Sequence, residues 1–265
     1  GREVRRPRPR AGAPSARARL ALKDLRARGD RSERALQGLT LEVRGGEIMG
    51  VAGVAGNGQK ELIEVLTGLR ALEAGSVALD GEDIGGRGAR ALLDAGVAHI
   101  PEDRNHMGVV PAFSVAENLV LRQYRYPPFS RWGLLEPAAL RRFADEAIRA
   151  YGVATPSRRS PTRLLSGGNV QKLILARELA REPRLVVAAH PTYGLDVAAT
   201  ALTHDLLLAQ RERGAAVLLV SEDLDELLKL CDRIAVLYGG RVMGVAEAEA
   251  ASAEALGLWM AGVAA

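Results

Sequence analysis

Two glycine-rich stretches of this 265-residue chain have the residue types and spacing that suit phosphate binding. In residues 165–172, Ser166, Gly167 and Gly168 stand directly before an apolar run with helical spacing. Glycines allow backbone N–H groups to approach a ligand without an intervening side chain, and the N-terminus of a helix attracts anions. The stretch is therefore a candidate phosphate-binding helix start. For an isolated Ser-Gly-Gly, a capped helix after a turn would be the simpler interpretation.

The second stretch, residues 53–61, follows an apolar segment at residues 48–52 and precedes a helical pattern that ends at Gly68. A strand, a glycine loop and a helix in this order are the layout of a phosphate-binding loop. The backbone N–H groups of such a loop need no side chain to hold phosphate. The residues expected at this site are Gly53, Gly56, Asn57, Gly58, Gln59, Lys60 and Glu61.

The side chains of this loop match the phosphate-binding pattern only in part. After the glycines, the pattern has a Lys, which neutralises the β- and γ-phosphates, and then a Ser or Thr, which holds Mg²⁺. This chain has Gln59 and then Lys60. A shift of one residue turns a helical side chain by about 100°. Lys60 either replaces the missing ammonium group or is a solvated lysine on the helix surface, and we favour the second interpretation.

An apolar segment, residues 185–189, and the run from Pro191 to Asp196 follow the Ser-Gly-Gly helix. Together with that helix, they resemble the signature motif, the Walker B strand and the D-loop of ABC-type ATPases. The resemblance covers about residues 20–245. The residues that it implies in nucleotide binding are Ser166, Gly167, Gly168, Asn169 and Asp196.

The resemblance implies an α/β fold, namely a three-layer P-loop NTPase core with a mixed sheet, an antiparallel β edge and an inserted α-helical subdomain. We expect a linker at residues 1–19 and an ABC ATPase domain at residues 20–265. Within that domain, the core is expected at residues 20–104 and 183–265, and the all-helical subdomain at about residues 105–182.

Four residues depart from the family's pattern outside the phosphate loop. Ala189 and His190 stand where the Walker B motif has an Asp for Mg²⁺ and a Glu for the attacking water. Ala189 cannot bind a metal, whereas His190 is either a candidate catalytic residue or a polar filler. Glu222 replaces the switch His near the γ-phosphate and is the second catalytic candidate. Glu102 replaces a Gln near Mg²⁺ and the lobe hinge. No residue is a confident metal ligand.

The family resemblance also implies a division of labour between two ATPase halves that pack head to tail. Each nucleotide then lies between the phosphate loop of one half and the signature of the other. We expect this chain to have a degenerate site of its own, with weak or no ATPase activity alone, and to give its signature to a competent partner loop. ATP and Mg²⁺ are then expected mainly at the composite site.

The implied function is to energise the import of a nucleoside or simple sugar at the cytoplasmic face of the cell membrane. Expected partners are an N-terminal ATPase half or second ATPase subunit, transmembrane permease subunits and, indirectly, an extracytoplasmic solute-binding protein. The start at Gly1 predicts a C-terminal, second half of a tandem importer ATPase. Two alternatives remain open, namely a non-catalytic regulatory half and a soluble ABC protein that acts on nucleic acid.

Composition constrains these interpretations only loosely. Hydrophobic residues make up 48% and charged residues 26%, as in ordinary globular proteins. The single Cys231 excludes an internal disulfide. The net charge of +4 is modest, and much of it lies in residues 1–19, which are rich in Arg and Pro. These residues lack the aromatic side chains that stack on bases, so we expect a disordered linker and no nucleic-acid partner.

The expected helical subdomain has aromatic residues whose role the sequence leaves open. Tyr126, Phe129 and Trp132 lie close together in an Arg- and Pro-rich segment. They are expected either to contact a membrane subunit or to pack in the subdomain's own core, and core packing is the commoner outcome for such residues.

Overall fold

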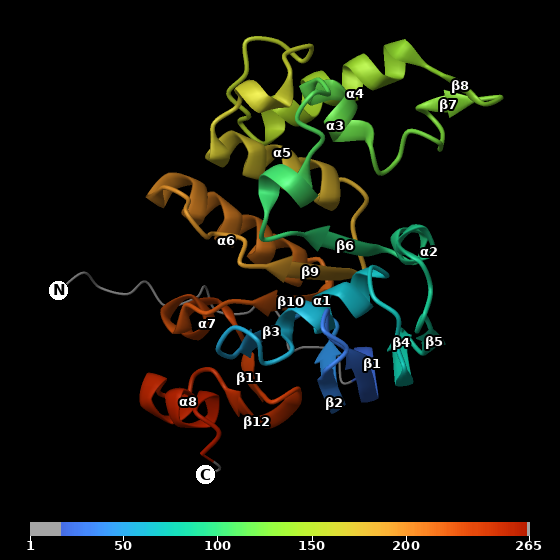
Figure 1. Cartoon of the computed structure of the whole chain (residues 1–265). Helices are drawn as coiled ribbons and strands as arrows, with labels where there is room; N and C mark the ends of the chain where they lie inside the picture. The colour runs from blue at the N-terminus through green and yellow to red at the C-terminus, as the bar shows by residue number, and fades with distance from the viewer. Residues whose placement is uncertain (1–16, 264–265) are drawn as a thin grey trace. The chain divides into compact units, whose positions relative to one another are not determined.

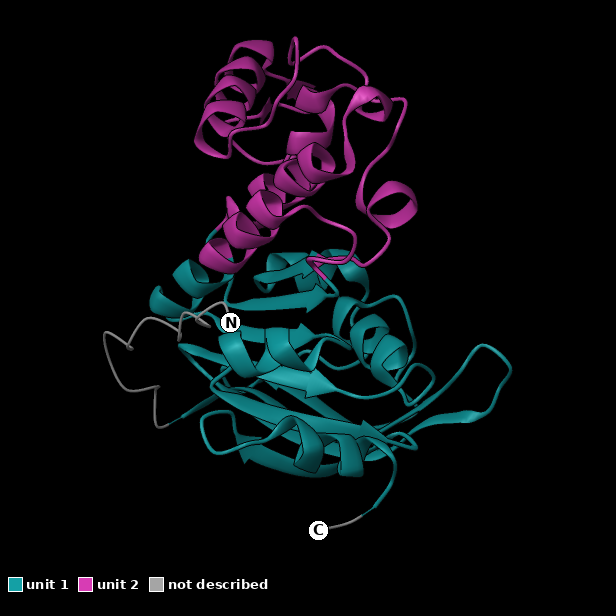
Figure 2. Cartoon of the chain, turned by 90° about the vertical axis from the view of Figure 1, so that its left-hand side faces the viewer, with its two compact units in different colours: residues 1–99, 182–190, 207–265 teal, residues 100–181, 191–206 magenta. Residues whose placement is uncertain are grey.

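The computed structural model describes residues 17–263. These residues form two compact units, shown separately coloured in Figure 2. Unit 1 takes the described part of residues 1–99 and 207–265 together with residues 182–190, and unit 2 takes residues 100–181 and 191–206. The predicted linker lies mostly outside the described residues. Its last two positions do not fit that prediction, because strand β1 (Ala18–Arg28) begins at Ala18.

Unit 1 contains an antiparallel sheet and a larger mixed sheet (Figure 1). The antiparallel sheet has the order β2-β1-β4-β5, with β2 (Arg34–Arg44), β4 (Ala74–Leu79) and β5 (Glu82–Asp83). The mixed sheet has the order β12-β11-β3-β10-β9-β6, with β12 (Arg241–Glu247), β11 (Arg233–Tyr238), β3 (Glu47–Ala52), β10 (Ala216–Val220), β9 (Leu185–Ala189) and β6 (Val97–Ile100). Strands β11, β3, β10 and β9 run parallel, and β12 pairs antiparallel with β11.

Helices cover both faces of the mixed sheet because its central strand β3 is apolar on both sides. Met49 and Val51 point into the core that also holds Leu62 of helix α1 (Gln59–Thr67). On the opposite face, helix α7 (Leu224–Leu230) packs so close that a Cβ on Gly50 would lie 3.1 Å from Leu227 Cδ2. Helix α8 (Ala253–Met260) packs on β11, and α2 (Ala89–Asp94) packs on α1.

Unit 2 is built mainly from helices, and the last of those before α6 is the Ser-Gly-Gly helix. These elements are η1 (Arg104–Gly108), α3 (Val115–Val120), α4 (Pro137–Ala150), η2 (Thr162–Leu164) and α5 (Gly167–Leu179). A capping box between Ser114 and Glu117 starts α3. The buried Asn118 then donates to Thr162 Oγ1 at 2.7 Å, which fixes the segment just before α5.

The expectation of an all-helical insert is wrong at one place. Strands β7 (Ser130–Arg131) and β8 (Leu134–Leu135) form a small antiparallel hairpin. Its turn residues, Trp132 and Gly133, have φ values of 55° and 79°, as a tight two-residue hairpin turn requires. A tryptophan is an unusual residue for this backbone conformation, so the usual Asn-Gly or Asp-Gly signal is missing from the sequence.

The three aromatic residues of this segment have different environments. Phe129 is buried and packs edge-to-face on Phe143, with ring centroids 5.2 Å apart, so it belongs to the core of unit 2. Tyr126 is half-buried beneath the guanidinium group of Arg181. Trp132 is 90% exposed. Only Trp132 is therefore as exposed as a contact with another subunit requires.

Helix α6 (Val197–Glu212) follows the Pro191–Asp196 run, and its residues belong partly to each unit. The buried residues of α6 are Ala199, Thr203, His204, Leu207, Gln210 and Arg211. Thr203 can be buried because its hydroxyl donates to the Ala199 carbonyl at 2.9 Å. Among residues 17–263, no helix has the length and apolarity needed to cross a membrane.

Candidate nucleotide-binding site

The loop at residues 53–58 has the backbone shape of a phosphate-binding loop. Gly56 and Gly58 have φ values of 86° and 105°, which side-chain-bearing residues rarely adopt. A Cβ on Gly58 would also lie 2.8 Å from the carbonyl oxygen of Ala35. Gly58 is the N-cap of α1 and has no side chain to cap the first-turn amides, so within the described residues these amides are left to a ligand or to water.

Asn57 holds this loop in place through hydrogen bonds of both its side chain and its backbone. Its side-chain amide donates to the Val54 carbonyl at 3.0 Å. Its side-chain oxygen accepts from Gly239 N at 2.8 Å, and its carbonyl accepts from Gly240 N at 3.1 Å. The turn between β11 and β12 therefore helps to fix the loop.

Gln59 lies where the phosphate-binding pattern has its lysine. Its side chain is only 8% exposed, and its Nε2 donates to the Val54 carbonyl at 3.2 Å. Its Oε1 is buried and has no hydrogen-bond partner among the described residues. The side chain is folded so tightly into the loop that a Cβ on Gly53 would lie 2.3 Å from Gln59 Nε2. A neutral amide thus occupies the position from which an ammonium group would meet phosphate.

Lys60 does not point its charge into the loop. Its Nζ pairs with Asp30 at 2.5 Å, and Arg70 pairs with the same carboxylate at 2.5 Å and with Glu64 at 2.6 Å. Hydrogen bonds from Lys60 and then from Arg70 lower the pKa of Asp30 to about 2, and Asp30 in turn raises the pKa of Lys60. The ammonium group therefore belongs to a surface ion-pair network on α1, as favoured from the sequence.

The carboxyl ends of the parallel strands bring three further positions near the loop. Val51, Val220 and Ala189 stand in register on β3, β10 and β9. The next residues after β9 and β10 include His190 and Glu222. His190 has a φ of 42° and donates its backbone N–H to the Val220 carbonyl at 2.8 Å, whereas Glu222 is exposed.

The residues around this loop do not fit Mg²⁺. The ion prefers several oxygen ligands in octahedral geometry, usually from carboxylate and hydroxyl groups together with phosphate. The positions that would supply them carry the methyl group of Ala189 and the ammonium group of Lys60. Residues 17–263 contain no group of three or more His, Cys, Asp or Glu side chains that could hold a metal ion.

The Ser-Gly-Gly stretch forms a second helix start, and this one has a complete set of side chains. Ser166 is the N-cap of α5, and no side chain caps the first-turn amides. Its hydroxyl accepts from Asn169 Nδ2 at 2.9 Å, and Asn169 Oδ1 accepts from Ala154 N at 2.8 Å. This arrangement orients the serine hydroxyl and leaves the Gly167 and Gly168 amides available to an anion.

Arg104 adds a positive charge to this helix start, and sequence reasoning missed it. Its Nη2 donates to the carbonyl of Tyr193. Its Nη1 is buried, has no hydrogen-bond partner in the described chain, and lies 3.8 Å from where a Cβ on Gly167 would be. Burial lowers the pKa of Arg104. In the sequence, Arg104 stands two residues after Glu102, which was singled out only for its own substitution.

Asp196 completes this part of unit 2. Its Oδ1 accepts from Ala199 N at 2.8 Å, and its Oδ2 lies 3.8 Å from where a Cβ on Gly168 would be. Glu102 is exposed and lies just before η1. We call Ser166–Asn169, Arg104 and Asp196 the signature face. The structure thus groups the predicted residues into two sets, the phosphate loop in unit 1 and the signature face in unit 2.

Comparison with known proteins identifies the family. The profile described as ABC transporter matches residues 36–193, which is more than half of the chain. The chain belongs to the ABC transporter family. The matched residues include the phosphate loop and the signature helix, and they end within the Pro191–Asp196 run.

Individual relatives agree with this family. The chain is 42% identical over 263 residues to the guanosine import ATP-binding protein NupO of Bacillus subtilis, covering 99% of the chain and 51% of that protein. It is also 42% identical over 268 residues to the glucose import ATP-binding protein TsgD13 of Haloferax volcanii, covering 99% of the chain and 48% of that protein. This ABC transporter chain spans about half the length of the curated relatives that it matches.

A solved structure confirms the fold class. The structure of a nucleotide-free ATP-binding cassette from an ABC transporter superposes with a TM-score of 0.74 at 20% identity, covering 87% of this chain and 92% of that one. The α/β P-loop NTPase fold with a mixed sheet, predicted from the sequence, is therefore correct.

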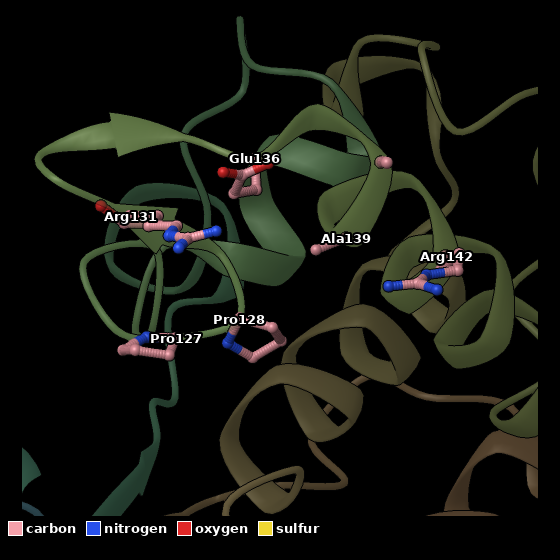
Figure 3. Close-up of a pocket in the computed structure, with 8 residues that line it drawn as sticks. Pro127, Pro128, Arg131, Glu136, Ala139 and Arg142 are labelled. Atoms are coloured by element: carbon pink, nitrogen blue, oxygen red, sulfur yellow. The ribbon is translucent and has the colours of Figure 1, made fainter.

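The ABC transporter chain also has a pocket outside both candidate regions. It lies in unit 2 and has a volume of about 460 Å³. Figure 3 shows Arg131 and Glu136 at one side of this pocket, Arg142 at the other, and Pro127 and Pro128 below them. None of the residues predicted to bind nucleotide lines this pocket.

Proposed function

We propose that this chain is a nucleotide-binding half of an ABC importer ATPase that couples ATP binding and hydrolysis to uptake of a nucleoside or simple sugar. The names of the relatives, which refer to guanosine and glucose import, support these two solute classes. We place the chain at the cytoplasmic face of the membrane, as the second half of a tandem pair. Permease subunits and, indirectly, a solute-binding protein are its partners, and nucleic acid is not.

One observation carries this proposal, namely the difference between the two helix starts. The signature face has its serine, its glycines and the half-buried guanidinium group of Arg104. The phosphate loop has a neutral Gln59, a Lys60 that is paired with Asp30, and no carboxylate at Ala189. A chain with this distribution is suited to stabilise the phosphates of a nucleotide that a partner's loop holds.

The composite site is therefore where we place ATP and Mg²⁺. The partner half supplies the lysine, the metal ligands and the base, and this chain supplies the N-terminus of α5. His190 and Glu222 lie at the chain's own loop, where the loss of a positioned base alone would reduce a hydrolysis rate by a factor on the order of 10² to 10⁴. We propose accordingly that this chain alone has weak or no ATPase activity.

The experiment compares substitutions in the two regions within the assembled transporter. Ser166 is exposed at the start of α5, so Ser166→Arg can be accommodated by the fold while it blocks the approach of a nucleotide. We expect it to reduce ATP hydrolysis by about 100-fold or more. Ser157→Arg, at an equally exposed serine of unit 2, is the matched control.

Gln59→Ala in the phosphate loop gives the contrast. We expect it to reduce hydrolysis far less than Ser166→Arg does, because turnover takes place at the partner's loop. If Gln59→Ala were the more damaging substitution, the division of labour would be wrong. If both variants retained full hydrolysis, the chain would be a non-catalytic regulatory half, which is the second candidate function that the altered loop favours.

A further inference from the structure

We propose that the chain's own phosphate loop is a metal-free site for a nucleoside diphosphate, and that it disfavours a third phosphate. This inference rests on the proposed function only in treating the loop as a nucleotide site. The loop is then a site whose preferred ligand is a diphosphate without metal, and not a weakened site for ATP with Mg²⁺.

The loop retains what a diphosphate needs. The hydrogen bonds from Asn57 to Val54, Gly239 and Gly240 hold the backbone in its loop conformation. Gly56 has open space around its Cβ position, and Gly58 leaves the first-turn amides of α1 uncapped. Backbone N–H groups at a helix N-terminus bind phosphate oxygens without help from a side chain.

The loop lacks the ammonium group that a triphosphate needs. Gln59 places a neutral amide where the ammonium group would stand, and its buried Oε1 is an unpartnered acceptor inside the loop. The β- and γ-phosphates both lose the cation that the pattern's lysine supplies, but a β-phosphate keeps the backbone N–H groups of the loop. The ammonium group of Lys60 is held by Asp30 at 2.5 Å on the surface of α1, and so it does not replace the missing charge.

The surroundings also disfavour Mg²⁺ and the charge of a γ-phosphate. Ala189 presents a methyl group where a carboxylate would bind the metal's water shell. Ser221 N donates to the Val51 carbonyl at 3.3 Å, so the chain leaves β10 beside the end of β3, and the next residue, Glu222, is exposed. A third phosphate would add negative charge to a loop that has neither an ammonium group nor a metal ligand at Ala189 to offset it.

The test measures binding by the chain itself, using calorimetry with ADP, ATP and inorganic pyrophosphate as probes. Each titration is made once with excess Mg²⁺ and once with a chelator. We expect ADP to bind at least as tightly as ATP, and Mg²⁺ to leave ADP affinity unchanged within about twofold or to weaken it. We also expect pyrophosphate to displace ADP, because the amides recognise the phosphates.

Three outcomes would overturn the proposal. The first is that the affinity for ATP rises about tenfold or more when Mg²⁺ is added. The second is that pyrophosphate fails to displace ADP, and the third is that none of the probes binds. None of them changes the expectation for Ser166→Arg in the assembled transporter, so a failure here is distinguishable from a failure of the proposed function.

A set of variants makes the test independent of the natural loop's affinity. The triple substitution Gln59→Lys, Lys60→Thr and Ala189→Asp returns an ammonium group, a hydroxyl and a carboxylate to the three altered positions. We expect it to prefer ATP over ADP by about tenfold and only when Mg²⁺ is present. Lys60→Thr alone is the matched control, and we expect Mg²⁺ to leave its nucleotide affinities unchanged. A triple variant that folds, by thermal melting, and remains indifferent to Mg²⁺ would show that these positions do not define the loop's ligand.

Discussion

The phosphate loop of unit 1 and the signature face of unit 2 are both helix starts with uncapped amides, yet they differ in charge. At α1, the N-cap is Gly58 in a left-handed conformation, and the nearest lysine is paired on the surface. At α5, the N-cap is Ser166 in an extended conformation, and Arg104 lies beside the first glycine with one nitrogen unpartnered. Both helix starts leave first-turn amides without a side-chain cap, and only the second has a half-buried guanidinium group beside it.

This difference teaches that the shape and the charge of a phosphate site have separate origins. The shape of the loop comes from glycines with positive φ and from the hydrogen bonds of Asn57. The charge comes from side chains that project from helix and strand ends, namely Gln59, Lys60 and Ala189. Lys60 and Ala189 supply none of the hydrogen bonds that fix the loop to the β11–β12 turn, whereas Gln59 adds one hydrogen bond within the loop, to the Val54 carbonyl. Substitution at Lys60 or Ala189 can therefore change the charge of the site while these hydrogen bonds remain.

The largest expected effect comes from breaking the shape of the phosphate loop. Gly58→Val places a β-branched side chain at a φ of 105° and close to the Ala35 carbonyl and Leu36. We expect it to lower the free energy of unfolding by about 3 kcal/mol, from backbone strain and overpacking together. Chemical denaturation of the unsubstituted protein and of the Gly58→Val variant measures this difference in unfolding free energy.

Gly56→Ala is the matched control for that substitution. Gly56 also has a positive φ, but no atom lies within 4 Å of its Cβ position. The loss should be limited to about 1 kcal/mol of backbone strain. Equal losses in the two variants would mean that the close contact at Gly58 does not matter, and that the loop is less tightly built than its hydrogen bonds indicate.

A smaller effect is expected from removing the cation of the signature face. Arg104→Ala should reduce ATP hydrolysis by the assembled transporter by about 10- to 100-fold, mainly through kcat, because the charge beside Gly167 and the tie to Tyr193 are both lost. Arg104→Lys should recover part of the rate, since it restores the charge without the forked geometry.

Arg159→Ala, at an exposed arginine of unit 2, is the control for Arg104. It should leave the rate unchanged within about twofold, because the salt-screened field of an exposed charge is weak. An Arg104→Ala variant with an unchanged rate would remove Arg104 from the signature face and would make the two helix starts more alike than we describe.

The smallest effect concerns the ion pair that holds Lys60 away from the loop. The folded state lowers the pKa of Asp30 from 3.8 to about 2, so the pair's contribution to stability is present above pH 3.8 and is lost as the pH falls toward 2. Because the pair is exposed, the contribution should be small. Thermal melts of the protein and of Asp30→Asn should therefore differ slightly above pH 4 and converge as the pH approaches 2. A difference that grows in acid would contradict this assignment.

The sequence was sufficient for those parts of the site that depend on local pattern. The strand before the loop, the glycines of the loop and the helix after it lie in one short segment, and each has a recognisable period or residue type. The same holds for Ser166 and helix α5. The fold class followed from these motifs and was confirmed by a solved ATP-binding cassette.

Features that depend on partners far apart in the chain were not predictable in this way. Asp30 lies 30 residues before Lys60, and Tyr193 lies 89 residues after Arg104, so neither contact leaves a periodic signal. The hairpin of β7 and β8 was missed for a different reason, since its turn places Trp132 in a conformation that tryptophan seldom adopts.

The hydrogen bonds between Asn57 and the β11–β12 turn have a consequence for folding during synthesis. Asn57 and Gly239 are 182 residues apart, so their hydrogen bond joins a segment to a turn that is synthesised much later. During synthesis a segment emerges before the residues that follow it, so its contacts with those residues form only later. A nascent chain that ends before residue 239 has the glycines of the loop but lacks the turn that braces them. Truncation before Gly239 should therefore weaken a loop whose own residues are all still present.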